Sequence, residues 1–313
     1  MHAHPVMSRH LDTTDIIIVQ MMLSNARTPS PQIADFLEIS AEEVDRRVAS
    51  LVEIGVLRSF MTRYTPSYLK SVGVLIYGRA ETTTFEDALA KLHRNESTSW
   101  VGLGSGGRLY AGATLRKLSQ LDSYTAFLRE EVGMQELVFG IRSAPPDLKQ
   151  ASMPLTELDR RILLSMQFDA RKSLFEVSKE VGESRETVEV RLASMVREKV
   201  IDFSAILSPE ACPDILCMLH LFRRGHNEMR EFMRSKLNQH SPSILFFNTF
   251  RNLPDLVMAM VWVSDMAELR EIKTSLEGEQ AIERVEANVI LASRVVESWA
   301  DALISNLAEP GVR

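Results

Sequence analysis

The sequence of 313 residues predicts a mixed α+β chain in which two winged helix-turn-helix units alternate with two ferredoxin-like βαββαβ units. Three observations lead to this prediction. Apolar residues recur at helical spacing in two short segments, and runs typical of strands and amphipathic helices follow each segment. The same order of elements then appears twice. The pattern therefore indicates two copies of one α+β module.

The segment 155–208 has the clearer helix-turn-helix pattern. Thr156 is placed to cap a first helix, residues 174–181 have the spacing of a second, and Gly182 ends it because glycine adopts positive φ at little steric cost. Ser184 caps a third helix, with half of a capping box because Thr187 follows instead of a glutamate. The strand KVIDFSAIL completes a winged unit. The predicted buried stripe is Leu158, Ile162, Leu163, Met166, Leu174, Val177, Val181, Val188, Leu192, Met195 and Val196.

Four runs follow one another in this segment: LDRRIL, DAR, SRETVEVRL and KVIDFSAIL. In order and spacing they resemble the N-terminal domain of the Lrp/AsnC transcriptional regulators, and the βαββαβ segments resemble the ligand-binding and oligomerisation domain of that family. The resemblance implies a regulator that binds double-stranded promoter DNA and forms homo-oligomers through its ferredoxin-like domains. It also implies a possible small-molecule, amino-acid-like effector. The start of the sequence shows no secretory signal, so a cytoplasmic protein is expected, and no cofactor is predicted.

Residues 11–64 match residues 155–208 at a constant offset of 144 positions, which indicates a tandem duplication. The expected domains are a flexible tail (1–10), a helix-turn-helix domain (11–66), a ferredoxin-like domain (67–147), a linker (148–154), a second helix-turn-helix domain (155–209) and a second ferredoxin-like domain with a C-terminal helix (210–313). The matching pairs include Leu11 with Leu155, Asp15 with Asp159, Ile18 with Ile162, Arg27 with Arg171, Ser40 with Ser184, and Arg47 with Arg191.

The two copies differ in charge. Residues 155–200 contain nine basic and nine acidic residues, whereas residues 11–64 contain five basic and eight acidic ones. Glu42 and Glu43 begin the third helix of the first copy, where they would repel phosphate. We therefore expect the second copy to bind DNA more strongly. The predicted DNA contacts are Ser184, Arg185, Thr187, Arg191, Arg171, Arg46 and Arg47.

Each of these DNA contacts has a structural alternative. Arg185 could instead form ion pairs with Glu186 and Glu189 on a solvated helix face. Arg191 and Arg47, in the middle of their helices, could support packing or bind a phosphate. Arg171 could contact a phosphate or form a structural salt bridge.

The effector of the Lrp/AsnC family binds around the turn between the second and third strands of the βαββαβ domain. The second copy has Asn252 and Asp255 in this turn but no glycine, and the first has Gly106, Gly107 and Arg108 but no acid. Both turns thus depart from the family pattern of a glycine-containing turn that ends in aspartate. These five residues are the predicted effector contacts, and an ordinary hairpin turn is the alternative.

Catalysis has little support, since no Ser/His/Asp, HExxH or CxxC pattern is present. The sirohaem decarboxylases share this architecture, so such an enzyme is one alternative, with His220, His226 and Arg251 as loose candidates. A non-DNA-binding oligomeric sensor is another. Cys212 and Cys217 are expected to be reduced thiols, and no metal site or membrane span is predicted.

Overall fold

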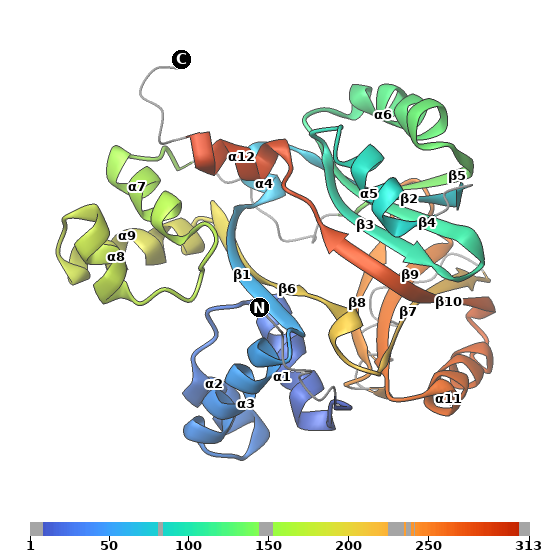
Figure 1. Cartoon of the computed structure of the whole chain (residues 1–313), viewed down its shortest axis with the longest axis horizontal. Helices are drawn as coiled ribbons and strands as arrows, with labels where there is room; N and C mark the ends of the chain where they lie inside the picture. The colour runs from blue at the N-terminus through green and yellow to red at the C-terminus, as the bar shows by residue number, and fades with distance from the viewer. Residues whose placement is uncertain are drawn as a thin grey trace, which may run out of the picture.

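The computed structural model describes residues 9–80, 84–143, 153–224, 235, 239–240 and 242–306. Two three-helix units lie beside a large β-structure, and a two-stranded ribbon connects them (Figure 1). Most of the predicted tail and linker lies outside the described residues, as do residues 225–234 of the second ferredoxin-like unit.

The first helical unit contains α1 (Thr13–Ser24), α2 (Ser30–Leu37) and α3 (Ala41–Glu53). The second contains α7 (Glu157–Met166), α8 (Leu174–Val181) and α9 (Arg185–Arg197). Both open with a capping box, formed by Asp12 and Asp15 in α1 and by Thr156 and Asp159 in α7. Gly182 ends α8 with φ of 68°, as its position after the helix predicts.

Most of the predicted stripe of the second unit lies in its core, as expected. Val188, Leu192 and Met195 are buried among the helices, and Ile304 of α12 (Trp299–Ser305) packs into the same core. The prediction for Val196 is wrong, because this side chain is 36% exposed. Met195 continues the stripe of Val188 and Leu192 at helical spacing, which turns Val196 away from the core.

Eight strands form one antiparallel sheet in the order β5-β2-β4-β3-β10-β7-β9-β8. The first four are β2 (Val72–Ala80), β3 (Thr98–Gly104), β4 (Arg108–Leu115) and β5 (Met134–Ile141). The last four are β7 (Ile215–Arg223), β8 (Ile244–Thr249), β9 (Leu256–Val263) and β10 (Ile282–Val295). Each half has the same strand order, and β3 pairs with β10 where the halves meet.

The outer edges of the sheet also approach each other. The Ser143 N–H donates to the Thr249 carbonyl at 2.9 Å, and the Arg251 N–H donates to the Ile141 carbonyl at 2.9 Å. Because Ile141 ends β5 and Thr249 ends β8, the sheet curves back on itself and has an inner and an outer face.

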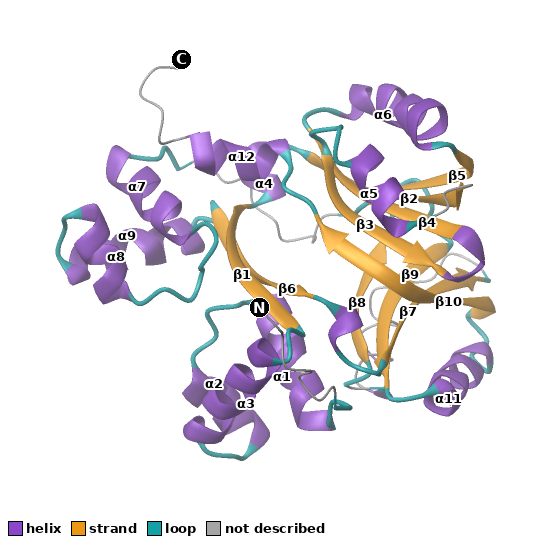
Figure 2. Cartoon of the chain, viewed as in Figure 1, coloured by secondary structure: helices purple, strands orange, loops and turns teal. Residues whose placement is uncertain are grey.

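Helices cover the outer face (Figure 2). α5 (Phe85–Leu92) and α6 (Leu121–Phe127) pack on the first four strands, and α11 (Met266–Glu277) packs on the last four. The inner face contributes to a separate core that continues into the first helical unit. No helix in the described ranges has the length and apolarity that a bilayer span requires.

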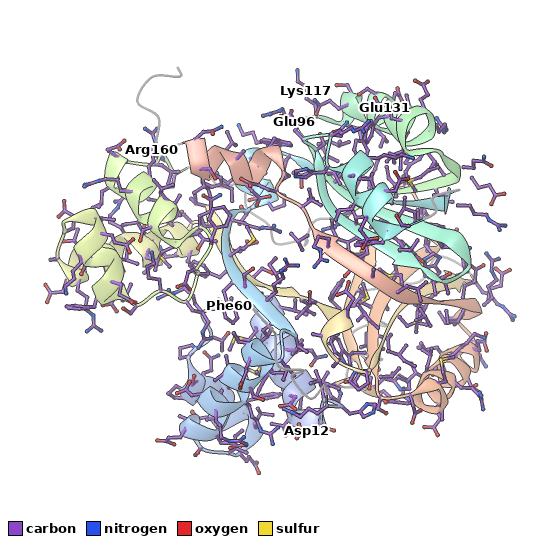
Figure 3. All side chains as sticks on the ribbon, viewed as in Figure 1. Asp12, Phe60, Glu96, Lys117, Glu131 and Arg160 are labelled. Atoms are coloured by element: carbon purple, nitrogen blue, oxygen red, sulfur yellow. The ribbon has the colours of Figure 1, made fainter. Side chains whose placement is uncertain are left out.

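The ribbon is formed by β1 (Leu57–Tyr64) and β6 (Ile201–Leu207), which pair antiparallel. Each strand lies against the helical unit of the other half. The Ala170 N–H donates to the Phe60 carbonyl at 2.9 Å, and the Ala26 N–H donates to the Phe203 carbonyl at 3.1 Å. Phe60 accordingly lies on β1 between the two units (Figure 3). This exchange ties the helical units to each other through the ribbon.

Candidate nucleic-acid interface and ligand pocket

The start of α9 presents one unpaired cation. The Ser184 Oγ accepts from the Thr187 N–H at 3.1 Å and lies 2.9 Å from the Thr187 Oγ1, so both predicted contacts are engaged in capping the helix. Arg185 is exposed, and it forms neither an ion pair nor a hydrogen bond with any residue in the described part of the chain. In particular, it does not pair with Glu186 or Glu189. Its guanidinium is therefore available to a ligand.

Arg191, in the middle of α9, is engaged in a structural ion pair. Its Nε donates to Asp159 Oδ1 at 2.8 Å and its Nη2 donates to Asp159 Oδ2 at 2.5 Å. The Asp159 side chain is fully buried, although burial would by itself disfavour its charge. Against that burial, the hydrogen bonds from Arg191 and Thr156 hold the pKa of Asp159 below its ordinary value. The pair thus fixes α9 to the start of α7.

The first unit repeats this arrangement with more acid around it. Arg47 Nη1 donates to Asp15 Oδ1 at 2.9 Å and to Asp12 Oδ2 at 2.8 Å, and its Nε donates to Glu43 at 2.7 Å. Arg46 forms a two-point contact with Glu43, at 2.6 and 2.8 Å. Hydrogen bonds from Arg46 and Arg47 lower the pKa of Glu43 to about 2. Both predicted DNA contacts of α3 are consequently neutralised within the unit.

Arg27 and Arg171 make reciprocal contacts between the helical units. Arg27 Nη1 donates to the Ala170 carbonyl at 2.6 Å, and Arg171 Nη1 donates to the Ala26 carbonyl at 3.0 Å. Arg171 also lies over the Phe60 ring, with its guanidinium carbon 5.5 Å from the ring centroid. The structure therefore gives Arg171 partners in the other unit, although the sequence predicts a phosphate contact or a salt bridge.

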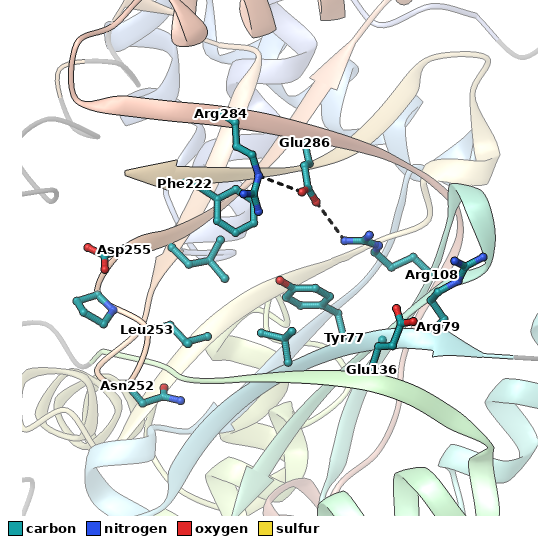
Figure 4. Close-up of a pocket in the computed structure, with 14 residues that line it drawn as sticks. Tyr77, Arg79, Arg108, Glu136, Phe222, Asn252, Leu253, Asp255, Arg284 and Glu286 are labelled. Atoms are coloured by element: carbon teal, nitrogen blue, oxygen red, sulfur yellow. Dashed lines mark hydrogen bonds and ion pairs between the residues drawn. The ribbon is translucent and has the colours of Figure 1, made fainter. Parts of the chain in front are cut away.

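A pocket of about 600 Å³ lies where the two halves of the sheet meet (Figure 4). It brings together three of the predicted effector residues, Arg108 from the first half and Asn252 and Asp255 from the second. Asn252 also joins the halves, since its amide donates to the Phe139 carbonyl at 2.8 Å and accepts from the Ile141 N–H at 2.7 Å. Gly106 and Gly107 do not line the pocket. They form the tight turn before β4, with φ of 69° and 72°.

Charges of both signs surround this pocket. Arg284 lies 3.6 Å above the Phe222 ring centroid and donates to Glu286 at 3.3 Å, and Arg108 donates to Glu286 at 3.4 Å (Figure 4). Asp255 lies on the opposite side. Such a mixture of guanidinium and carboxylate groups suits a small molecule that carries both an anionic and a cationic group.

His220, a loose catalytic candidate, lies buried beside this pocket. Its Nδ1 is 3.5 Å from Arg108 and its Nε2 is 3.0 Å from the Tyr110 hydroxyl. Burial, with the charge of Arg108, lowers the pKa of His220 to about 3, so the ring is neutral at physiological pH and its approach to Glu286 is not an ion pair. Arg251 is exposed outside the pocket, and His226 lies outside the described residues. Among described residues, no group of three metal-ligating side chains occurs.

Sequence reasoning missed much of the pocket lining. The missed charged and aromatic residues come from β2, β5, β7 and β10, and no local motif connects them in the sequence. They meet only because the two halves of the sheet join. The charged and aromatic members of this set are Tyr77, Arg79, Glu136, Phe222, Arg284 and Glu286.

Comparison with known proteins bears on the second helical unit. The model of the AsnC-type helix-turn-helix domain matches residues 155–196, which span α7 to α9. The three helices of this segment are thus similar to an AsnC-type helix-turn-helix domain. The resemblance predicted for this segment is confirmed, whereas a second such domain at residues 11–66 stays a prediction.

Two similar proteins are transcriptional regulators. The HTH-type transcriptional regulator LysM of Sulfurisphaera tokodaii is 37% identical over 54 residues, which cover 17% of this chain and 39% of that protein. An uncharacterised HTH-type transcriptional regulator of Pyrococcus furiosus is 28% identical over 153 residues, which cover 48% of this chain and 99% of that protein. These relatives agree with the AsnC-type match and support a likeness to the Lrp/AsnC regulators.

A solved structure extends the likeness to the whole fold. The siroheme decarboxylase NirDL aligns over 94% of this chain and 98% of its own, with a TM-score of 0.58 and 14% sequence identity. The same enzyme in complex with an iron-uroporphyrin III analogue gives the same values. At this level of identity, the match shows a shared mixed α+β fold.

Proposed function

We propose that this protein is a sequence-specific DNA-binding transcriptional regulator of the Lrp/AsnC type, and that α9 is its main reading helix. The observation that carries the proposal is Arg185, an unpaired guanidinium at the start of the third helix of an AsnC-type domain. In helix-turn-helix proteins, the start of this helix contacts base edges in the major groove, and arginine pairs with guanine in two-point contacts. Thr187 and Ser184 hold the start of the helix, and Arg191 holds its middle.

The proposal includes a tandem duplication with two winged helix-turn-helix and two ferredoxin-like domains. It is supported by the equal strand order of the two halves and by the reciprocal contacts of Arg27 and Arg171. One chain would then present two unlike reading helices to an asymmetric DNA site. Because the arginines of α3 are already paired with its acidic residues, this helix binds DNA more weakly than α9.

The pocket between the halves is the proposed effector site. Arg108 is placed to pair with a carboxylate and Asp255 with an ammonium group, as an amino-acid-like molecule requires. Homo-oligomers through the ferredoxin-like domains belong to the same proposal, although β3 and β10 already join the two halves within one chain.

Selection of bound fragments from genomic DNA, followed by footprinting with the purified chain, tests the proposal. We expect protection of a defined duplex, with an affinity that falls as salt concentration rises because phosphate contacts release counterions. Absence of duplex protection even at low salt would contradict the regulator and favour an oligomeric sensor.

The full-length structural match supports a second candidate, an enzyme that acts on a tetrapyrrole. Its support is the fold alone, since neither of the described candidates, His220 and Arg251, lines the ligand pocket. A visible-absorption titration with an iron tetrapyrrole discriminates between the two candidates. A saturable spectral change with loss of carbon dioxide from the ligand supports the enzyme, and an unchanged spectrum contradicts it.

A further inference from the structure

A second cavity, of about 760 Å³, lies between the β1–β6 ribbon and the inner face of the sheet. The ribbon contributes Arg63 and Asp202 to its wall, and the sheet contributes Leu75, Met218 and Met260. No predicted DNA or effector contact lines it. Its volume falls in the range of roughly 300–1,000 Å³ that is usual for small-molecule sites.

Arg142 is the unusual group in this cavity. Its side chain forms no hydrogen bond or ion pair with any described residue, although protein surrounds it closely enough for desolvation to lower the pKa of the guanidinium. By its accessible surface Arg142 is exposed, and it lines the cavity. A guanidinium at a cavity wall that has no protein partner is available to pair with an anionic ligand.

Arg63 and Asp301, two of the other charges of the cavity wall, form an ion pair. Arg63 Nε lies 3.0 Å from Asp301 Oδ1, and Asp202 is close enough for the charge of Arg63 to act on it. Arg142 is separate from this cluster. Its side chain lies over Gly73 of β2 and Gly112 of β4. A Cβ atom added at Gly73 would be 3.4 Å from the Arg142 Cδ, and one added at Gly112 would be 3.6 Å from the Arg142 Nη2.

Most of the remaining wall is apolar. Trp100 and Arg142 both lie next to Gly112. A Cβ atom added at Gly112 would be 3.2 Å from the Trp100 Cβ and 3.6 Å from the Arg142 Nη2. Leu75, Met218 and Met260 extend the apolar wall along the inner face. A ligand that matches this lining has one anionic group and a large apolar body.

We propose that the cavity binds a mostly apolar molecule with a single carboxylate, and that this carboxylate pairs with Arg142. The two parallel N–H groups of a guanidinium match the two oxygens of a carboxylate. The apolar body lies against Trp100 and the inner face of the sheet, away from Asp202. This site is distinct from the effector pocket, and the proposal does not depend on DNA binding.

Calorimetric titration of the full chain with dodecanoate tests the proposal, with dodecanol as the neutral probe. Wild-type protein is expected to bind one dodecanoate per chain, and Arg142→Met to bind it about 10- to 100-fold more weakly, as the loss of a charge-assisted contact predicts. The two proteins should bind dodecanol equally. Arg251→Met is the matched control, because Arg251 is exposed outside the cavity, and it should leave both affinities unchanged.

Two further measurements locate the bound molecule and keep the test decisive if one variant fails to fold. Dodecanoate should change the fluorescence of Trp100, and Trp100→Phe should abolish that change. Asn248→Phe, which fills part of the cavity from β8, should weaken both dodecanoate and dodecanol. Equal dodecanoate affinity in wild type and Arg142→Met overturns the proposal. Failure of dodecanoate to bind also overturns it, as does saturable binding of the octacarboxylate uroporphyrin III in its place.

Discussion

Two arginines of α9 have opposite surroundings. Arg191 forms a two-point ion pair with the buried Asp159, whereas Arg185 is exposed and unpaired within the described chain. Replacing one member of a buried pair leaves the other charge without compensation, which is costly. Replacing an exposed, unpaired side chain changes stability little. We therefore expect Arg191 to contribute to the stability of the fold and Arg185 to contribute to DNA recognition.

Arg191→Met should lower the free energy of unfolding by about 2 kcal/mol at pH 7, below the range for fully buried pairs because the arginine is partly exposed. Arg185→Met should change it by less than about 0.5 kcal/mol. Since the pair holds the pKa of Asp159 below its ordinary value, its contribution is present above about pH 4 and is lost as pH falls further. Urea unfolding of both variants checks this, and equal losses would contradict it.

For Asp202 we expect the opposite dependence of stability on pH. Burial raises the pKa of Asp202 to about 6, so ionisation of this group destabilises the folded chain as pH rises from about 4 to above 6. Asp202→Asn should match wild type near pH 4 and be more stable by about 1 kcal/mol at pH 8, a value discounted for solvent in the cavity. Urea unfolding at both pH values measures this. A variant less stable than wild type at pH 8 would show that the attraction to Arg63 outweighs burial.

At the scale of elements, the exchanged ribbon determines how the helical units sit together. Arg171 of the second unit donates to the Ala26 carbonyl of the first unit, and Arg27 of the first unit donates to the Ala170 carbonyl of the second. Arg171→Met should cost about 1 kcal/mol and speed amide exchange at Ala26, whose N–H donates to Phe203 on β6. Exchange followed by mass spectrometry checks this prediction. Arg58→Met, a substitution of an exposed residue on β1, is the control. Equal amide exchange at Ala26 in the two variants would contradict the proposed role of Arg171 in holding the units together.

Individual helices were more predictable than their contacts. The span 174–181 of α8 and the caps at Thr156 and Ser184 follow from local residue patterns, because capping and glycine termination act within one turn. Val196 was misplaced since spacing alone does not decide which of two adjacent apolar residues faces the core. The roles of Arg171 and Arg191 depended on partners that are distant in the sequence, at Ala26 and Asp159.

At the scale of the whole molecule, both candidate ligand sites arise from joining the halves. Arg108 and Asp255 were predicted as effector contacts from separate turns, and the joined sheet places them around one pocket. Arg284 and Arg142 carried no signal in the sequence, because their significance comes from segments that meet only in the folded chain. The sequence predicts the mixed α+β class and the resemblance of residues 155–196 to an AsnC-type domain because both depend on local residue patterns.

The central claim is that α9 reads DNA through Arg185. The most direct test is the dissociation constant of the selected duplex for wild type and Arg185→Met, measured by fluorescence anisotropy at one fixed salt concentration. Loss of a two-point contact with guanine predicts binding about 5- to 150-fold weaker, with the free energy of unfolding unchanged. An equal dissociation constant in the two proteins would contradict the claim.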